Sequence, residues 1–442
     1  MVRNFIEFPP LGVVIVCMLG VGVAERTGLI AAALKALMLV VPRRLLTPMV
    51  VFIGVNASLA ADAGFIVLPP LAALLYKRAG RSPLAGIAAA FAGVAGGFSA
   101  NLFITSLDPL LSTLTQSGAR IIDPAAVVNP ACNWWFMIAA TFLITLVGWP
   151  VSSLLVEPRL AARPPDQGGA PIHITTEARI PDAFTSTERR ALAFAAATFA
   201  AAAAILLASA LIPGAPLFTQ RPTDPAGSAR WIAVIVPIIF TLFLFPGLAY
   251  GRASGSLARF SDVARLMAES VASLAPMLVL AFFAAQFIAY FKYTNLDRML
   301  AFSVGKQLSA ADLSPTLLLV ALVVVVMALD MLMASASAKW SLLAPIFVPM
   351  FMLLGIGPAA TQAAYRIGDS VTNPITPLNP YMVIVLLAVQ RYAPKARTGT
   401  ILAMQAPFAI TFACAWLLML LAWTTLGFDF GPGGPVLYQP SR

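Results

Sequence analysis

The stretch GDSVTNPITPLNPY, residues 368 to 381, decides the fold because it places helix-breaking residues inside a long apolar run. Pro374, Pro377 and Pro380 interrupt a regular helix, and Asp369 brings a charge into apolar surroundings. In a membrane, irregular backbone is tolerated only where protein or a water-filled cavity satisfies its polar groups. The stretch therefore predicts a broken membrane helix beside a cavity, provided that the chain is a membrane protein.

The overall composition meets that condition. Of the 442 residues, 60% are hydrophobic and 10% are charged, and the mean hydropathy is +0.89. Too little polar material remains to cover a water-soluble globule. The net charge of +10 falls in short segments between apolar runs, where it sets orientation and does not indicate nucleic-acid binding. We therefore expect an all-α polytopic membrane protein in contact with lipid.

The cysteines and the histidine argue against metal and triad chemistry. Cys17, Cys132 and Cys414 lie far apart in apolar sequence, and His173 is the single histidine. A two-histidine metal site is excluded, and the sequence lacks the HExxH and GxSxG motifs of common hydrolases. We predict no cofactor and no enzyme activity. An intramembrane enzyme, such as a paired-aspartate protease, stays open as a lower-ranked alternative.

Several apolar stretches have the roughly 20 residues that a membrane-crossing helix needs. Residues 46–76 and 316–353 are each too long for one helix and too short for two, so we predict two re-entrant hairpins. Residues 83–110 and 360–390 carry interruptions of Gly, Pro and Asn, so we predict two broken helices. The predicted full-length spans are residues 131–156, 188–212, 229–250, 266–291 and 400–426.

An internal repeat relates the two unusual regions. Three Gly and Pro positions in the first half recur 275 positions later, and two polar positions recur at slightly shorter offsets. The pairs are Pro70 with Pro345, Pro83 with Pro358, Gly93 with Gly368, Asn101 with Asn373, and Asp108-Pro109 with Asn379-Pro380. The repeat predicts that each half holds one hairpin followed by one broken helix.

The charge distribution predicts that the halves are inverted in the membrane. We take residues 1–155 as the first half, 156–190 as a polar cytoplasmic linker and 191–442 as the second half. If the first hairpin opens toward the cytoplasm and the second toward the outside, inner segments hold 16 of the 28 basic residues and outer segments hold 8. This ratio agrees with the positive-inside rule. An inverted repeat with broken helices is typical of secondary transporters.

A helix broken near the midplane exposes free N–H groups at one end and free C=O groups at the other, so it can bind an anion and a cation. GGFSANLFITSLDP, residues 96–109, is the counterpart of the opening stretch. Side-chain oxygens at the breaks are candidate ligands for Na+ or a polar substrate. They belong to Ser99, Asn101, Ser370, Thr372 and Asn373. The alternative is that Gly and Pro, including Gly368, only kink two packed helices.

Charges inside the membrane are a sharper signal, because an unpaired charge there is costly. Arg366 and Asp369 are three residues apart, so they share a helix face and form a structural pair or a binding site. Arg366 has the planar fork of donors that binds a carboxylate, and Asp369 can orient it or carry a proton. Asp108 has no charged neighbour within a turn, which favours a functional group facing the cavity; the alternative is a helix-end position near the outer surface.

The predicted hairpin tips carry further polar residues. Asp62 falls at the first tip, where capping and transport are equally good explanations. At the second tip, Ser337, Lys339 and Trp340 offer a hydroxyl, a cation and an aromatic ring. Trp340 is either an anchor at the membrane interface or a platform for an aryl substrate. Asp330 precedes this tip, and we hypothesise that it pairs with Lys339.

Five motifs together resemble the AbgT family of bacterial inner-membrane transporters. They are SLAADAGFIVLPPLAALLY, GGFSANLFITSLDPLL, VEPRL, SASAKWSLLAPIFVPM and YRIGDSVTNPITPLNPY, and the resemblance extends over essentially the whole chain. The resemblance implies a homodimer and a transport path lined by seven residues. These residues are Asp108, Ser337, Trp340, Pro358, Arg366, Asp369 and Pro377. Family members usually have a further helix before the segment beginning MVRNFIEF, so we expect that Met1 is an internal methionine, with loss of that helix as the alternative.

The resemblance also implies a function. The family is associated with p-aminobenzoyl-glutamate and, in some members, with efflux of sulfonamide-type antimetabolites. We therefore expect a secondary active transporter of p-aminobenzoyl-glutamate or related aryl carboxylates, with antimetabolite efflux as the alternative. A channel fits less well, because each half holds a hairpin and a broken helix. Protonation of Asp108 or Asp369 would give proton coupling, and the oxygens at the breaks would give sodium coupling. The direction of transport does not follow from the sequence.

Overall fold

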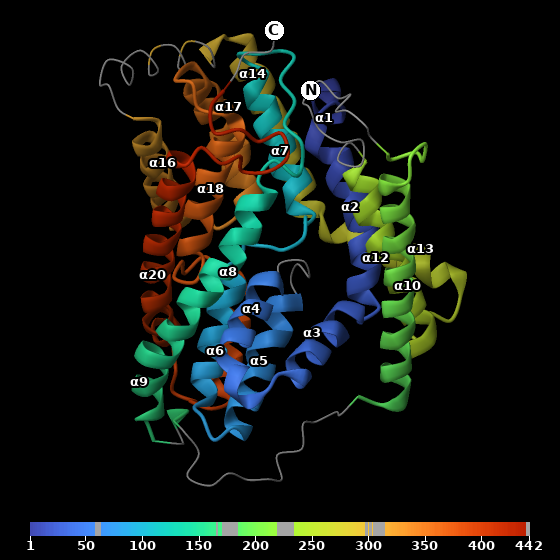
Figure 1. The fold of residues 1–442 in the computed structure, drawn as a ribbon, viewed down its shortest axis with the longest axis vertical. Helices are drawn as coiled ribbons and strands as arrows, with labels where there is room; N and C mark the ends of the chain where they lie inside the picture. Colours follow the sequence, from blue (N-terminus) through green and yellow to red (C-terminus); the bar gives the residue numbers. More distant parts are fainter. Residues whose placement is uncertain are drawn as a thin grey trace.

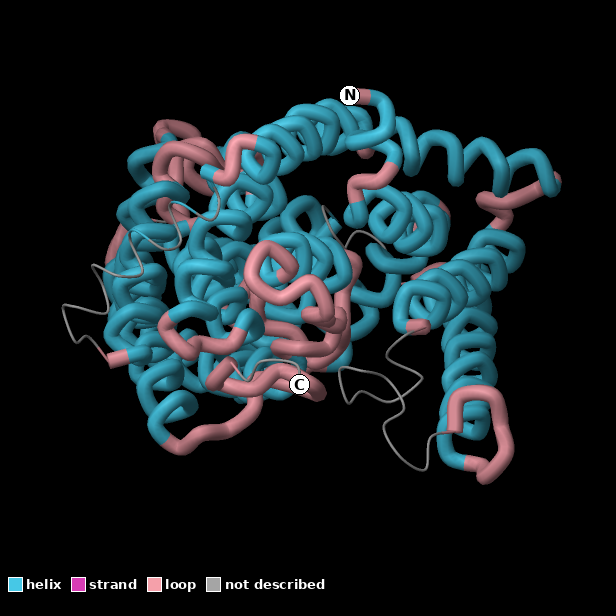
Figure 2. Tube along the Cα trace, turned by 90° about the horizontal axis from the view of Figure 1, so that it is seen from above, coloured by secondary structure: helices cyan, strands magenta, loops and turns pink. Residues whose placement is uncertain are grey.

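The structure, a computed structural model, describes residues 1–57, 63–164, 167–169, 184–218, 234–296 and 314–438, with residues 299 and 303. Asp62, His173 and residues 165–166 and 170–183 of the predicted linker 156–190 lie outside the described residues. Seen from above in Figure 2, every described element is a helix or a loop. Among the described residues, one isolated antiparallel β-bridge joins Ile356 and Leu437.

The helices of the first part of the chain are α1 Val2–Ile6, α2 Pro9–Arg26, α3 Leu29–Val40, α4 Leu46–Asn56, α5 Ala63–Arg78, α6 Pro83–Phe91, α7 Leu107–Ala119, α8 Trp134–Pro150 and α9 Glu157–Ala161. Those of the second part are α10 Ser186–Leu211, α12 Ile235–Ser254, α13 Phe260–Ser273, α14 Ala275–Tyr293, α16 Pro315–Asp330, α17 Ala336–Leu353, α18 Pro358–Thr372, α19 Met382–Gln390 and α20 Thr398–Thr425. The all-helical membrane fold expected from composition is confirmed.

Five helical stretches among the described residues are long and apolar enough to cross a membrane. They are Trp134–Ala161, Ser186–Leu211, Ile235–Ser254, Ala336–Leu353 and Thr398–Thr425. Four of them confirm predicted spans to within a few residues. The pair α2 and α3 adds a sixth candidate, bent by 60°. Gly28 lies at this bend with φ +87°, a left-handed conformation that residues with a Cβ rarely adopt.

The predicted span 266–291 is wrong as a single helix, because α13 ends at Ser273 and α14, Ala275–Tyr293, covers its remaining apolar part. Asp262, Arg265 and Glu269 place charges along α13, and Arg265 pairs with Glu269 at 3.2 Å. An amphipathic helix of this kind is typical of the membrane interface. Asp262 accepts backbone N–H groups at the start of α13, and these hydrogen bonds lower the pKa of its carboxyl.

The helices form two neighbouring groups (Figure 1). At one edge, α10 packs along α12, and α12 packs along α2. At the opposite edge, α16, α18 and α20 lie side by side, with α17 next to α18. α7 contacts α17, α18 and α2, so it lies between the two groups. The polar residues singled out in the sequence lie mainly on α7, α16, α17 and α18.

The two interrupted regions each contain two helices with irregular backbone between them. α6 continues as a π-helical turn, Ala92–Gly96, and α7 begins at Leu107. α18 ends at Thr372, and α19 begins at Met382. The second break therefore starts after Gly368, which lies inside α18 and does not end it. Asp108 lies in the first turn of α7.

The predicted hairpins correspond to α4 with α5 and to α16 with α17. Residues 331–335 join α16 to α17, whereas residues 58–62 at the first tip lie outside the described part of the chain. α17 has the length and apolar composition of a span. The re-entrant path of these helices and the inverted orientation of the halves stay predictions.

Two glycines make matching close contacts in the proposed repeat. A Cβ on Gly93 would lie 2.7 Å from the carbonyl oxygen of Val51 in α4. A Cβ on Gly368 would lie 2.7 Å from the carbonyl oxygen of Val323 in α16. In each half, a helix of the predicted hairpin approaches the broken helix at a glycine. Glycine allows these contacts because it has no side chain, and its conformational freedom is not required here.

We predict that Gly368→Ala lowers the stability of the protein by about 1–3 kcal/mol, because the added methyl forces α16 and α18 apart. Thermal unfolding of the detergent-solubilised protein measures this loss. Gly12→Ala is the matched control, since a Cβ on Gly12 meets no atom of the described residues within 4 Å. The control should be neutral or slightly stabilising, because alanine favours helix. Equal stability of the two variants would contradict the close contact at Gly368.

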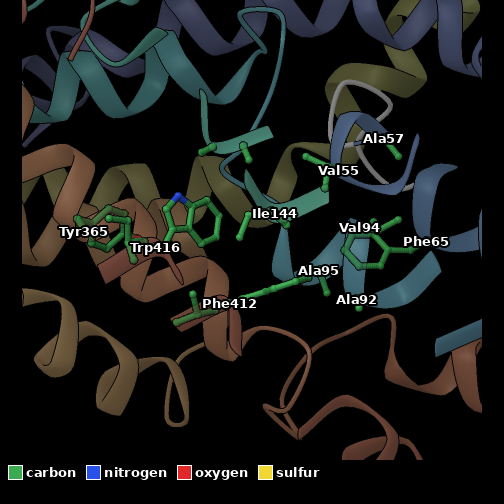
Figure 3. Close-up of a cluster of buried hydrophobic side chains, with 14 of the residues drawn as sticks. Val55, Ala57, Phe65, Ala92, Val94, Ala95, Ile144, Tyr365, Phe412 and Trp416 are labelled. Atoms are coloured by element: carbon green, nitrogen blue, oxygen red, sulfur yellow. The ribbon is translucent and has the colours of Figure 1, made fainter. Parts of the chain in front are cut away.

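The first break is embedded in apolar packing. Figure 3 shows Val94 and Ala95 of the π-helical turn in one buried cluster with Phe412 and Trp416 of α20. A Cβ on Gly96 would lie 2.8 Å from the Phe412 ring. The end of this half-helix is therefore held by tight packing, which fixes the backbone that follows it.

Candidate functional site

One face of α18 carries the central polar residues of the molecule. Gln362, Arg366 and Asp369 are spaced by four and three residues, so they lie along one side of the helix. All three side chains are buried, with at most 3% of each residue exposed. Helices α7, α16 and α17 pack against α18 and cover it. Buried polar groups need partners, so their contacts define the site.

Arg366 binds Asp108 across the interface between α18 and α7. Its Nη1 donates to Asp108 Oδ1 at 2.5 Å. The other oxygen, Oδ2, accepts the backbone N–H of Thr105 at 2.6 Å and the Thr105 hydroxyl at 2.8 Å. Asp108 lies in the first turn of α7, where the helix dipole favours a negative charge. The carboxylate is thus held in place directly after the first break.

The rest of the Arg366 guanidinium has no hydrogen-bond partner among the residues that the structure describes. Its Nε and Nη2 atoms are buried and make no hydrogen bond within the described part of the chain. These two atoms form one edge of the planar group, with two parallel donors that match the two oxygens of a carboxylate. Gln362 Nε2, one turn away on α18, is also buried and without a partner there. This side of α18 offers donors to an anion.

Trp340 lies inside the protein, so its predicted role as an interface anchor is wrong. It has 0% exposure, because α7 and α18 cover it. Its ring stacks on Tyr365 with centroids 4.3 Å apart. Its Nε1 donates to the Thr115 hydroxyl at 2.9 Å, and that hydroxyl donates to Gln362 Oε1 at 2.6 Å. Trp340 therefore connects α17 to α7 and α18.

Lys339 lies between two carboxylates. Its Nζ is 2.8 Å from Asp369 Oδ1 and also contacts Asp330 Oδ1. The hypothesised pair of Asp330 with Lys339 is confirmed. The predicted structural pair of Arg366 with Asp369 is wrong, since each binds a charge on a neighbouring helix. Spacing along one helix shows which residues share a face, and it does not show which helices cover that face.

The two breaks meet through a hydrogen bond. The backbone N–H of Ser99 in the first break donates to the Ser370 hydroxyl near the end of α18, at 3.1 Å. The Thr372 hydroxyl donates to Asp330 Oδ2 at 2.8 Å. Asn101 and Asn373 are both buried at the breaks. The five predicted ligands thus lie around the two breaks, and the described residues contain no group of three His, Cys, Asp or Glu that could hold a metal ion.

Three residues of the predicted transport path lie apart from this network. Ser337 is half-buried and lines a small pocket with Phe8 and Leu110, on the side of α17 toward α7 and α14. Pro358 occupies the first turn of α18, where proline fits a helix start. Pro377 is exposed in the second break. None of the three makes a hydrogen bond to Arg366, Asp369 or Trp340 among the described residues.

Sequence reasoning did not single out Thr115, Gln362 and Tyr365. Thr115 accepts from Trp340 and donates to Gln362, while the Tyr365 hydroxyl contacts the carbonyl oxygen of Ala336 and lies 3.4 Å from Asp369 Oδ1. Gln362 gave a usable signal, because it lies four residues before Arg366 within a buried helix. Thr115 gave none, since a lone threonine in an apolar helix usually bonds its own backbone.

Comparisons with known proteins agree with this architecture. The sequence profile described as "AbgT putative transporter family" matches residues 1–438. The p-aminobenzoyl-glutamate transport protein of Escherichia coli strain K12 is 36% identical over 435 residues, which are 98% of this chain and 83% of that protein.

Two solved structures are similar over nearly the whole chain. The Alcanivorax borkumensis YdaH transporter is 42% identical with a TM-score of 0.89, covering 98% of this chain and 88% of that one. Neisseria gonorrhoeae MtrF, described with a class of antimetabolite efflux pumps, is 40% identical with a TM-score of 0.88, covering 99% of this chain and 85% of that one. The family and these relatives are named as transporters or efflux pumps. This chain is a polytopic membrane protein that belongs to the AbgT family of bacterial transporters.

Proposed function

We propose that the protein moves p-aminobenzoyl-glutamate or related aryl carboxylates across the bacterial inner membrane by alternating access. The observation that carries this proposal is the buried Arg366 guanidinium, whose Nε and Nη2 edge is free of partners among the described residues. A dicarboxylate supplies the paired oxygens that this edge binds. The similarity to the E. coli p-aminobenzoyl-glutamate transport protein supports the substrate class.

The neighbouring residues have supporting roles in this proposal. Asp108 binds Nη1 and thereby orients the guanidinium, leaving the other edge toward the substrate. Gln362 Nε2 offers a further donor one turn away. Trp340 holds Tyr365 and Thr115 in place as a positioning residue, since its own ring is fully covered.

Efflux of sulfonamide-type antimetabolites is the second candidate function. It is favoured by the similarity to MtrF, which has a TM-score of 0.88 and is described with antimetabolite efflux pumps. Import and efflux use the same site, and the coupling gradient decides the direction. A proton on Asp369 or Asp108 would couple transport to the pH gradient, whereas oxygens at the breaks would couple it to sodium.

The proposal includes a homodimer in contact with lipid. α10 is largely uncovered, because only 11% of its most apolar stretch is buried inside the protein. Large apolar side chains, including Phe194, Ile205 and Leu207, point away from the protein. An apolar surface of this length needs lipid or a second copy of the chain to cover it.

Uptake of labelled p-aminobenzoyl-glutamate into proteoliposomes tests the proposed function. We expect accumulation under an imposed sodium gradient or an imposed pH gradient, applied in separate runs, and no accumulation in Arg366→Ala. Accumulation under one gradient alone identifies the coupling ion. If the folded wild-type protein accumulates nothing, labelled sulfonamide efflux from the same vesicles tests the second candidate. Failure of both would contradict the assigned substrate classes.

A further inference from the structure

The buried charges of the described residues do not balance. Five charged residues are buried there: three aspartates, one lysine and one arginine. Arg366 compensates Asp108, so the single ammonium of Lys339 faces both Asp330 and Asp369. Each of these side chains has at most 2% exposure. An excess carboxylate in such a place attracts a cation.

The position of the Lys339 ammonium is set by oxygen atoms and by helix ends. Asp330 is the last residue of α16, and Asp369 lies in the last turn of α18. Carbonyl groups at the end of a helix carry partial negative charge, so two helix ends add to the attraction. The Thr372 hydroxyl lies 2.8 Å from Asp330 Oδ2. Carboxylate and hydroxyl oxygens are the ligands that hard cations prefer.

Two observations show that the cluster holds a cation strongly and has unused capacity. Lys339 lies at the end of the first turn of α17, where the dipole of its own helix disfavours a positive charge, so the carboxylates determine its place. Asp369 Oδ2 is buried and makes no hydrogen bond among the described residues. An oxygen of this carboxylate is therefore available for a further ligand.

We propose that the Lys339 ammonium is a resident cation that occupies a monovalent-cation site formed by Asp330, Asp369 and Thr372. The wild-type protein then takes no sodium ion at this site, because the lysine supplies the charge. Removing the ammonium opens the site, and the variant binds sodium from solution. The transport part of this proposal rests on the proposed function, whereas the binding part does not.

Thermal unfolding of detergent-solubilised Lys339→Ala tests the binding part without any substrate. In sodium chloride, relative to choline chloride at equal concentration, we expect its unfolding temperature to rise by several degrees more than that of the wild type. An ion that binds only the folded state stabilises it in proportion to the logarithm of its concentration. Lys339→Gln, with a neutral side chain of similar length, repeats the measurement if Lys339→Ala does not fold.

Two control variants make the result specific. The double variant Lys339→Ala, Asp330→Asn lacks one of the carboxylates, so the additional sodium response should disappear. Lys35→Ala removes a lysine of α3 outside the cluster, where Nζ lies 4.8 Å above the Phe184 ring, and should respond as the wild type does. A sodium response in Lys339→Ala equal to that of the wild type, or one that survives Asp330→Asn, would overturn the proposal.

The transport part uses the same variants in proteoliposomes with p-aminobenzoyl-glutamate. Sodium should stimulate uptake by Lys339→Gln several-fold more than uptake by the wild type. If no protein transports this substrate, the proposed function fails while the unfolding experiment still decides the binding site. If the wild type transports and Lys339→Gln shows no additional sodium stimulation despite binding sodium, the resident cation has no part in transport.

Discussion

Arg366→Ala should lower the rate of p-aminobenzoyl-glutamate uptake by about 100-fold or more at limiting substrate concentration. The variant loses the free Nε and Nη2 edge that we assign to the substrate carboxylate. A hydrogen bond to a charged group contributes about 1.5–3 kcal/mol, and two such bonds on one carboxylate account for a loss of this size. Initial uptake rates in proteoliposomes, corrected for the amount of reconstituted protein, measure it.

Arg366→Lys separates charge from geometry. Lysine retains the positive charge beside Asp108 but lacks the planar pair of donors, so uptake should remain well below that of the wild type. Asp108→Asn is the matched control for the other end of the pair. It keeps a side chain of the same shape while removing the charge that orients Arg366, and a smaller loss is expected. Undiminished uptake by Arg366→Ala would contradict its assignment to the substrate site.

Trp340→Ala should lower the free energy of unfolding by about 3–5 kcal/mol, the range for removing a large aromatic side chain from a core. The ring is fully buried, stacks on Tyr365 and donates to Thr115. Trp340→Phe keeps a ring beside Tyr365 and loses only the hydrogen bond and part of the contact, so about 1–2 kcal/mol should be lost. Unfolding of the detergent-solubilised protein distinguishes the two variants.

Trp135→Ala is the matched control, because Trp135 in α8 is 46% exposed and should contribute about 0.5 kcal/mol or less. We also expect Trp340→Phe to retain most of the uptake activity, since the role of Trp340 is to hold α18 in position. If Trp340→Phe is stable but inactive, the ring acts on the substrate directly. If Trp340→Ala and Trp135→Ala are equally stable, the described packing of Trp340 is wrong.

Much of the fold is predictable from the sequence, for simple reasons. Four of the five spans predicted from apolar stretches of membrane length are observed, and the Pro and Asn residues after Thr372 correctly predict the second break. The prediction of one span over 266–291 is wrong because the apolar residues of α13 run directly into those of α14 in the sequence. The charged face of the shorter helix α13 is therefore not apparent from the sequence. Gly368 misleads because its small size serves a helix contact, whereas sequence reasoning assigned it to the break.

The candidate site is only partly predictable. The unusual residue types, namely Asp108, Arg366, Asp369 and Lys339, stand out because charges are rare in apolar sequence. Their pairing does not follow, since Asp108 and Arg366 are separated by 258 positions and their contact depends on how α7 packs on α18. Trp340 was expected at a hairpin tip, as an interface anchor or a platform for an aryl substrate, and its burial depends on the same packing of α7.

The contacts among α7, α17 and α18 also bear on how the protein can move. Asp108 with Arg366, Thr115 with Gln362, and Trp340 with Thr115 are buried polar contacts that cross between these helices. Sliding one of the three past another would break several of them at once in a place without water to replace them. We therefore expect the three helices to travel as one rigid body. The surface along which that body slides should lie toward α2, which α7 contacts and which packs on α12.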